Sequence, residues 1–597
     1  MSIEWEADTM APHRGFWCGQ KMSIEWEVDT MALHIGLDEV SKDNLMQHLE
    51  WFSKVRRDTG GPGENAAADY ISDKLASYGV ECIVHEYESY LSYPIHAKLE
   101  VLEPEYMCFQ ALTHSFGKST GPHGVTAQLK YLTDQTVRYG TGRAVMIDGL
   151  QDPIPTVDAY EAGVSALIFV NADWYIHNMI ATPVWGTPSY SQLGQIPDIP
   201  CISINHESGE KLKDLLKEGP VTVRVTAEVK TGWVHCKLPE AIIRGTEEPE
   251  KFVLAAGHMC AWEVGITDNA TGDACLLEMA RLLNLHRAEL KRSVRIAWWP
   301  GHSHGRYAGS CWYSDHYWEE LSDNCLMYYN IDSPGAKNAT QYRVKHTSAE
   351  CERFGQDMIT KVTGQVNSPK HRPSKCADQS FLMIGVPSCS CYSFIPDNHP
   401  DRKMWTGGSA GGWWWHTEFD TLDKADVDIL AKDTELSCAI ATELTNCDIL
   451  PFHYGDVARE AETIIGKIAE TAGAYVDFSS LLKKVSDFRA AADKLEKAQT
   501  GGSDPHLINE LIMETGRLIV PVIYNSSGRF VHDQAEVSPL RRFTSSMLYP
   551  VLSAAAGLPE LAGQNEFGFL KAEVIREINR AGDAFTRATK LINRALR

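Results

Sequence analysis

Two apolar segments of the chain each lead to histidine, and this pattern constrains the fold more than any other. Residues 252–256 read as a buried strand that leads to His258, and residues 294–299 lead to His302 and His304. The residues between the two segments place apolar side chains at helical spacing. A strand, a helix and a second strand indicate an α/β fold, in which ligands bind at the carboxyl ends of the strands. We therefore expect the histidines to meet in one site.

Three further side chains suited to metal binding stand at comparable positions. Asp268 lies in a turn ten residues after His258, and Asp332 ends another apolar run that begins at residue 325. His416 lies in a tryptophan-rich loop before a predicted helix. Imidazole nitrogens and carboxylate oxygens are ligands that zinc and related divalent cations prefer. The sequence thus predicts a metal site.

Five short segments resemble, in the same order, sequence blocks of the co-catalytic zinc aminopeptidase and glutamate carboxypeptidase superfamily. They read TDNATG, YAGS, NIDSPG, DQSFLMIGVPS and HTEFDTLDK. The resemblance implies an α/β fold with a mixed sheet flanked by helices. It implies a hydrolase of an amide or peptide bond that uses one or two divalent ions, with zinc favoured and iron as the other candidate. It also implies that Asp268 bridges two cations, since a bridging carboxylate holds them a few ångströms apart.

The chain departs from the superfamily where that family has two adjacent glutamates, a general base and a metal ligand. Aligned from Trp299, His302 takes the place of the base and Ser303 that of the ligand. Aligned back from Gly309-Ser310, the same two places fall to Ser303 and His304. The sequence leaves both alignments open. Because serine is short and weakly acidic, we predict that His304 binds metal and that His302 is the catalytic base.

Five other positions bear on catalysis or substrate binding. Cys260 stands where the superfamily has an aspartate that orients the site, and Glu263 is a candidate for the missing general base. Arg306 takes a position that is usually apolar or glycine, and it can hold a substrate carboxylate. Trp415 is expected to form a wall of the substrate cavity. Asp378, a candidate for substrate binding, lies in a segment that resembles the loop closing the cavity.

Two ligand sets follow from these assignments. The first site holds His258, Asp268 and Asp332, and the second holds Asp268, His416 and His304. The second set contains two histidines and one carboxylate, a combination that non-haem iron enzymes also use. A transition-metal enzyme other than a peptidase, with iron as the cation, is therefore an alternative prediction. A receptor-like binding protein without catalysis is a second alternative.

The chain divides into four predicted parts. Residues 1–35 contain a repeated segment and are expected to be poorly ordered. Residues 36–117 and 234–447 form the predicted catalytic domain, and the β-rich residues 118–233 resemble an inserted protease-associated domain. Residues 448–597 have helical patterns and resemble, by their position, the helical dimerisation domain of the same superfamily. The resemblance implies a homodimer.

The acidic composition limits the possible partners. A net charge of −23 argues against nucleic acid and anionic membranes, which attract basic surfaces. No apolar run reaches the length of a transmembrane helix, and the N-terminal sequence is too acidic for a signal peptide. The 15 cysteines show no paired spacing, which favours reduced thiols in the cytoplasm. A small molecule or a short peptide is the expected substrate.

Overall fold

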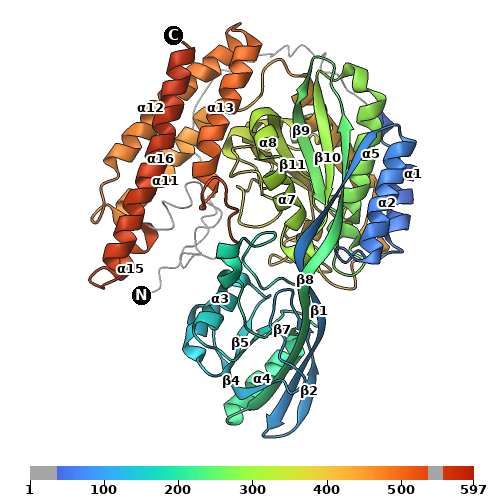
Figure 1. Cartoon of the computed structure of the whole chain (residues 1–597), viewed down its shortest axis with the longest axis vertical. Helices are drawn as coiled ribbons and strands as arrows, with labels where there is room; N and C mark the ends of the chain where they lie inside the picture. Colours follow the sequence, from blue (N-terminus) through green and yellow to red (C-terminus); the bar gives the residue numbers. More distant parts are fainter. Residues whose placement is uncertain (1–36, 536–554) are drawn as a thin grey trace, which may run out of the picture. The chain divides into compact units, whose positions relative to one another are not determined.

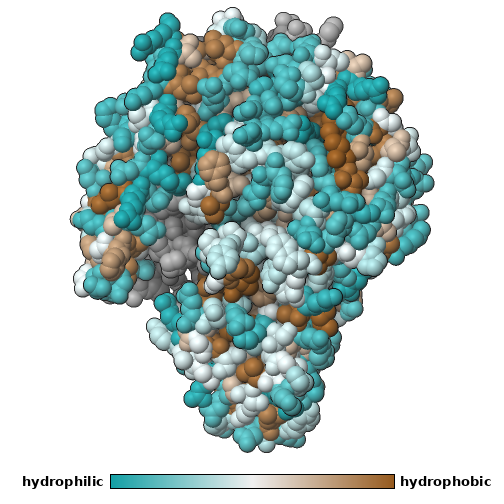
Figure 2. All heavy atoms as spheres, in the orientation of Figure 1, coloured by the Kyte–Doolittle hydropathy of each residue, from teal (hydrophilic) through white to brown (hydrophobic). Residues whose placement is uncertain are grey.

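The computed structural model describes residues 37–535 and 555–597, all within one compact unit. The repeated segment, residues 1–35, lies outside the described residues, so the expectation of poor order stays a prediction. Across the described ranges, none of the helices is both long and apolar enough to cross a membrane. The face shown in Figure 2 is mostly hydrophilic, with hydrophobic side chains in separate patches.

Most of the strands form one mixed sheet of 12 members, part of which is seen in Figure 1. The predicted site lies at the carboxyl ends of its parallel strands β9 (Glu248–His258), β10 (Arg292–Trp299) and β11 (Cys325–Asn330). The other strands in that part are β1 (Glu81–Glu103), β8 (Thr222–Ile243) and β13 (Ser388–Cys389). Strands β13, β11, β9 and β10 run parallel to their neighbours in this order, whereas β8 is antiparallel to both β10 and β1. The α/β fold with a mixed sheet is confirmed.

Strands β1 and β8 continue from this part of the sheet into the insert. They contain 23 and 22 residues and pair antiparallel along almost their whole length. The middle of each long strand lacks a regular alternation of buried and exposed side chains, so sequence patterns do not reveal the full length of either strand. The two predicted domains are therefore joined by continuous strands and not by a linker.

The insert is β-rich and adds strands to the same sheet, in the order β8-β4-β5-β6-β7-β3. The elements of this part are β2 (Met107–Gln110), β3 (Leu112–Thr113), β4 (Val125–Tyr131), β5 (Ala144–Asp148), α3 (Pro153–Glu161), β6 (Ala166–Val170), β7 (Cys201–Ile204) and α4 (His206–Glu218). Strands β5, β6 and β7 are short, and almost all of their residues are buried because helices and loops cover both faces.

Helices flank the catalytic part of the sheet. They are α1 (Lys42–Phe52), α2 (Pro62–Ser77), α5 (Thr271–Leu285), α7 (Ala308–His316), α8 (Trp318–Asn324), α9 (Glu352–Thr363) and α10 (Val427–Asn446). Helix α5, which connects β9 to β10, is buried along most of its length because α1, α2 and α10 pack against it. A separate pair of short strands, β12 (Gln341–Val344) and β14 (Cys391–Phe394), lies beside the site.

The C-terminal region is helical, as predicted. Its helices are α11 (Tyr454–Ala472), α12 (Ser479–Thr500), α13 (Pro505–Tyr524), α15 (Leu558–Leu561) and α16 (Phe567–Ala595). Helix α12 packs on α11 and α16, and α16 also packs on α13. Their buried apolar side chains belong to the same core as those of α5 and α10, so these helices do not form a separate hydrophobic unit.

A buried arginine braces the loop that follows β9. The side chain of Arg57 is fully buried and donates to the carbonyls of Met259, Val264 and Gly265 at 2.8 to 2.9 Å. These carbonyls belong to the loop between His258 and the next helix, where no strand partner satisfies them. Arg57 therefore fixes the path of the chain immediately after the first predicted metal ligand.

Replacing Arg57 by leucine is expected to destabilise the protein strongly. The carbonyls of Met259 and Val264 lose a donor and that of Gly265 loses one of two, which lowers the free energy of unfolding by about 3 kcal/mol. The neighbouring residue supplies a matched control: Arg56 is half exposed and pairs with Asp58 and Glu263, so Arg56→Leu should cost only about 0–1 kcal/mol. Denaturant titration of both variants measures the difference in the free energy of unfolding. Equal unfolding midpoints would contradict the stabilising role of Arg57.

Candidate metal centre

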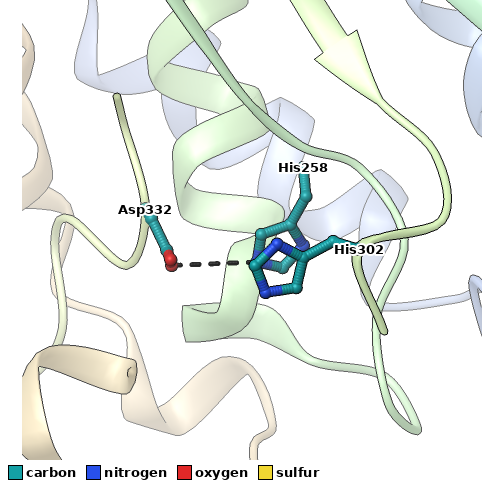
Figure 3. A group of neighbouring side chains, drawn as sticks. All are labelled: His258, His302 and Asp332. Carbon is teal, nitrogen blue, oxygen red and sulfur yellow. Dashed lines mark ion pairs between the residues drawn. The ribbon is translucent and has the colours of Figure 1, made fainter. Parts of the chain in front are cut away.

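Three side chains from different segments meet at the carboxyl end of the sheet (Figure 3). His258 ends β9, His302 begins the short helix α6 (His302–Gly305) that follows β10, and Asp332 comes shortly after β11. One ligand atom of each residue lies within 4.8 Å of the others. The rings of His258 and His302 stack with their centroids 4.0 Å apart. The three groups could hold one metal ion together.

Asp268 links this cluster to His416 through its two carboxylate oxygens. Oδ1 lies 3.1 Å from Nε2 of His258, and Oδ2 lies 3.1 Å from Nε2 of His416. The carboxylate is buried and comes from the turn Ile266–Ala270, directly before α5. One oxygen thus faces each of two imidazoles, the arrangement expected of a carboxylate that bridges two cations.

Backbone carbonyls orient two of the histidines. Nδ1 of His258 donates to the carbonyl of Cys260 at 2.8 Å, and Nδ1 of His416 donates to the carbonyl of Asn178 in the insert at 2.7 Å. Because Nδ1 carries the proton in each bond, Nε2 keeps the lone pair that a metal ion needs. The carbonyl of Cys260 thus supplies the hydrogen bond for which the superfamily uses an aspartate side chain.

A carboxylate orients the third histidine. Oδ2 of Asp378 accepts from Nδ1 of His302 at 2.7 Å, and Oδ1 accepts from the hydroxyl of Ser310 at 2.7 Å. Asp378 is 1% exposed, so the structure places it behind the imidazole and not against a substrate. A carboxylate in this position fixes the ring and makes its Nε2 more basic.

The charges of the cluster stabilise one another. Burial alone would raise the pKa of Asp268, but hydrogen bonds from His258 and His416 hold it well below its ordinary value. Burial likewise opposes ionisation of Asp332, yet His258 lowers its pKa. Burial would lower the pKa of His258, but Asp268 and Asp332 raise it well above its ordinary value. Ionised carboxylates beside imidazole nitrogens are a donor set that fits a divalent transition-metal ion.

His304 does not join the cluster. It is buried, its Nδ1 lies 3.3 Å from the hydroxyl of Thr59, and its ring centroid lies 4.4 Å from that of Trp262. Burial lowers the pKa of His304 to about 4. Residues two apart point the same way on a strand but diverge by roughly 200° around a helix. Because residues 302–305 form a helical turn, the structure brings His302 to the ligand group and directs His304 away from it.

The other predicted residues divide between the cavity and its surroundings. Arg306 and Trp415 both line the cavity beside the cluster. Glu263, the candidate base, is not among the described residues that line this cavity. Its carboxylate pairs instead with Arg56 at 2.6 Å, because its loop turns outward after Cys260. The geometry therefore gives Glu263 no access to the cluster.

The cavity has a volume of about 400 Å³ and contains three basic side chains. Arg306 is 8% exposed and donates to the carbonyl of Ile180, and Lys345 donates to the carbonyl of Gly407. Neither of these two cations forms an ion pair with any residue that the structure describes. The third, Lys375, pairs with Asp533. Two cations that form no ion pair with a described residue thus face the space next to the cluster, which Asp152, Asp268 and Asp332 also line.

Sequence reasoning missed Lys345 and Asn178. Lys345 immediately follows β12, whose sequence Gln-Tyr-Arg-Val is not an apolar run, so the signal that identified His258 was missing here. Asn178 contributes its backbone carbonyl, for which its side chain gives no signal. The contact joins residues 238 positions apart, and no local pattern could have revealed it.

Comparisons with known proteins agree with this fold. Residues 241–441, which contain the cluster, match the model of Peptidase family M28. A probable glutamate carboxypeptidase of Zea mays, VP8, is 24% identical over 476 residues, which cover 66% of this chain and 65% of that protein. The probable leucine aminopeptidase 2 of Aspergillus oryzae is 22% identical over 481 residues, covering 74% of this chain and 93% of that protein. The chain spans only 43% of another relative, the probable glutamate carboxypeptidase LAMP1 of Arabidopsis thaliana.

Solved structures share the architecture. An aminopeptidase from Aneurinibacillus sp. strain AM-1 superposes with a TM-score of 0.54 at 18% identity, covering 69% of this chain and 95% of that one. BSAP, a zinc aminopeptidase from Bacillus subtilis, superposes with a TM-score of 0.52 at 18% identity, covering 68% and 94%. The fold is therefore of the zinc aminopeptidase type. Residues 241–441 thus resemble Peptidase family M28 in sequence, and the chain shares its fold with the zinc aminopeptidases.

The variant Asp378→Asn is expected to weaken metal binding by roughly 10- to 100-fold, because the amide holds the imidazole of His302 without making it more basic. Competition with a chelating dye measures the affinity. Asp315→Asn is a matched control, since Asp315 makes a similar bond of 2.9 Å to His532, which is not one of the clustered histidines. If Asp378→Asn binds the metal as tightly as the unaltered protein, Asp378 has no orienting role.

Proposed function

We propose that the protein is a metal-dependent hydrolase that cleaves an amide or peptide bond. The observation that carries this proposal is the cluster of His258, His302 and Asp332, with Asp268 beside it, at the wall of a cavity. The match of residues 241–441 to Peptidase family M28 supports the same reaction. Zinc is the favoured cation, because a solved neighbour is a zinc aminopeptidase and the donor atoms suit zinc.

In the ligand set that we propose, His302 binds the metal in place of His304, the ligand expected from the sequence. His258, His302, Asp268 and Asp332 hold one ion, and the second oxygen of Asp268 with Nε2 of His416 forms one side of a second position. Only two protein ligands of the second position are evident among the described residues. We therefore propose one firmly held ion and a weaker second one.

The chemistry of such a site rests on a bound divalent cation, which polarises a carbonyl and lowers the pKa of water. The chain itself positions the reacting groups. Asp268 and Asp332 stay ionised and supply the negative charge that holds a cation, and Asp378 fixes the ring of His302. No glutamate occurs among the described residues that line the cavity, so proton transfer cannot use the base of the superfamily.

The substrate that we propose carries a negative charge, as a carboxylate does. Arg306 and Lys345 face the cavity without an ion pair to a described residue, and a carboxylate can bind both. Trp405 and Trp415 line the same space and offer flat apolar walls. A cavity of about 400 Å³ suits a small molecule or a short peptide.

One observation favours a second candidate function. His258, His302 and Asp332 are two histidines and one carboxylate, the set that non-haem iron enzymes use. An iron-dependent enzyme on the same fold is therefore the alternative proposal. Elemental analysis of the purified protein separates the two, because stoichiometric iron in place of zinc favours the alternative.

Three features stay proposals that rest on the resemblance. They are the identity of the β-rich insert with a protease-associated domain, a homodimer formed through the C-terminal helices, and a location in the cytoplasm. The β-rich insert and the helical C-terminal region are compatible with the first two.

The two histidines after β10 form a natural matched pair for testing the metal ligands. His302→Ala is expected to lower metal affinity at least 100-fold and to abolish turnover, because a ligand of the tighter ion is lost. His304→Ala should keep its metal, since that side chain faces Thr59 and Trp262. Metal content by elemental analysis is the measurement. Loss of metal from the His304 variant alone would restore the assignment expected from the sequence.

The charge of the substrate is tested at Lys345. Lys345→Met should raise KM roughly tenfold for an N-acyl dipeptide with a free carboxylate, since one charged hydrogen bond is lost. The same dipeptide with a neutral amide end should be affected little. Lys370→Met is the control, because Lys370 is exposed and pairs with Glu352 away from the cavity. Equal changes in KM for both dipeptides would contradict a role in charge recognition.

A further inference from the structure

A second large cavity lies far along the sheet from the metal cluster, at the opposite ends of the parallel strands. It has a volume of about 670 Å³, within the range of ligand-binding sites. Its floor includes Lys251 near the start of β9 and residues 322–324 just before β11. Its walls come from α13, α16 and Arg529. We call this space the C-terminal groove.

Helix α16 presents a row of positive charges to the C-terminal groove. Arg587, Lys590 and Arg594 are spaced three and four residues apart, so they lie on one face of the helix. Arg529 faces them from the segment after α13, and its guanidinium lies over the ring of Trp318 at 4.8 Å. Four basic side chains from two segments therefore converge on one space.

Two other cations of the groove are already satisfied. Lys251 pairs with Glu510 at 2.8 Å. Arg517 donates to four backbone carbonyls, those of Leu321, Ser322, Gly385 and Cys325. These two side chains hold α13 against the sheet, so they have a structural role that leaves them little capacity for a ligand.

The four converging cations have no comparable partners within the described ranges. Arg529, Lys590 and Arg594 form no ion pair with any described residue, and Arg587 approaches only Asp583, at 3.8 Å with both side chains more than 60% exposed. Burial and the nearby charge of Arg587 lower the pKa of Arg529. Two acidic side chains, Asp323 and Glu514, also line the groove without an ion pair to a described residue. The cations still outnumber them.

These four side chains are exposed, and they gather in one place on a chain with a net charge of −23. Arg372, by contrast, pairs with both Glu352 and Glu460. Like charges held together without counter-charges repel one another, and this repulsion is relieved when an anion binds between them. The charge of the groove is thus complementary to that of a small anion with several negative charges.

We propose that the C-terminal groove binds a small anion that carries two or more phosphate groups. Three guanidinium groups favour phosphate, because each can donate two parallel hydrogen bonds to phosphate oxygens. A single carboxylate could satisfy one of the four cations, whereas a chain of linked phosphates carries enough charge and enough oxygen atoms for all of them. The shared chemistry includes free polyphosphate and the phosphate tail of a nucleotide. The groove does not depend on the proposed hydrolysis.

Calorimetric titration of the full metal-loaded chain with tripolyphosphate tests this proposal. Saturable binding of one molecule per chain is expected, with an affinity that falls steeply as salt rises. The double variant Arg587→Gln, Arg594→Gln should weaken binding at least tenfold. Arg576→Gln is the matched control, because Arg576 is exposed on the same helix but does not line the groove, and it should bind normally. Metal content is measured before and after titration, since polyphosphates also chelate cations.

Further titrations distinguish the C-terminal groove from the metal-site cavity and phosphate from other anions. Lys345→Met should leave tripolyphosphate binding unchanged. If this variant loses tripolyphosphate binding, the anion binds in the metal-site cavity and the proposal is overturned. Absence of saturable binding, or equal weakening by Arg576→Gln, would also overturn it. A hexaglutamate peptide that binds as tightly would show a site for acidic peptides instead. Tripolyphosphate binding in the groove supports the proposal, and comparison with ATP then tells whether a nucleoside adds to the affinity of the phosphate chain.

Discussion

The carboxylate of Asp268 is buried between two imidazoles, and an ionised group at that depth is stable only when partners surround it. The residues on either side of it hold it there. Asn269 donates to the carbonyls of His258 and Ile331, which end neighbouring strands, and the residue before Asp268 donates to Asp420 through its amide and hydroxyl. One short turn thus fastens two strand ends and the loop after His416. Because this turn is fixed, the neighbouring ligands His258, Asp332 and His416 are held in position as well.

Much of this arrangement could be predicted from local patterns. The positions of His258 and Asp332 followed from apolar runs that stop at polar residues, because the end of a strand is set by a few neighbouring side chains. Asp268 and His416 were identified instead in a turn and a loop that resemble sequence blocks of the superfamily. The choice between His302 and His304 could not be predicted in this way. It depends on whether the residues after Gly301 continue as an irregular loop or turn as a helix, and tertiary packing decides that.

The length of β1 and β8 was also beyond the sequence patterns. Periodicity identifies a strand only where one face is buried and the other exposed, and the middle of these strands has neither face consistently buried. The backbone carbonyl that orients His416 belongs to the same class of feature, since any residue could supply it. What local sequence does not encode here is long-range pairing, whether of strands or of a carbonyl with an imidazole.

The contact between the insert and His416 has a consequence for how the protein assembles its site. His177 and Asn178 bind the carbonyl of Trp415 and the ring of His416, across a separation of 238 residues. Order in the insert and order at the metal position are therefore linked thermodynamically: whatever stabilises one stabilises the other. A cation bound by Nε2 of His416 would therefore also stabilise the docking of the insert against the rest of the chain.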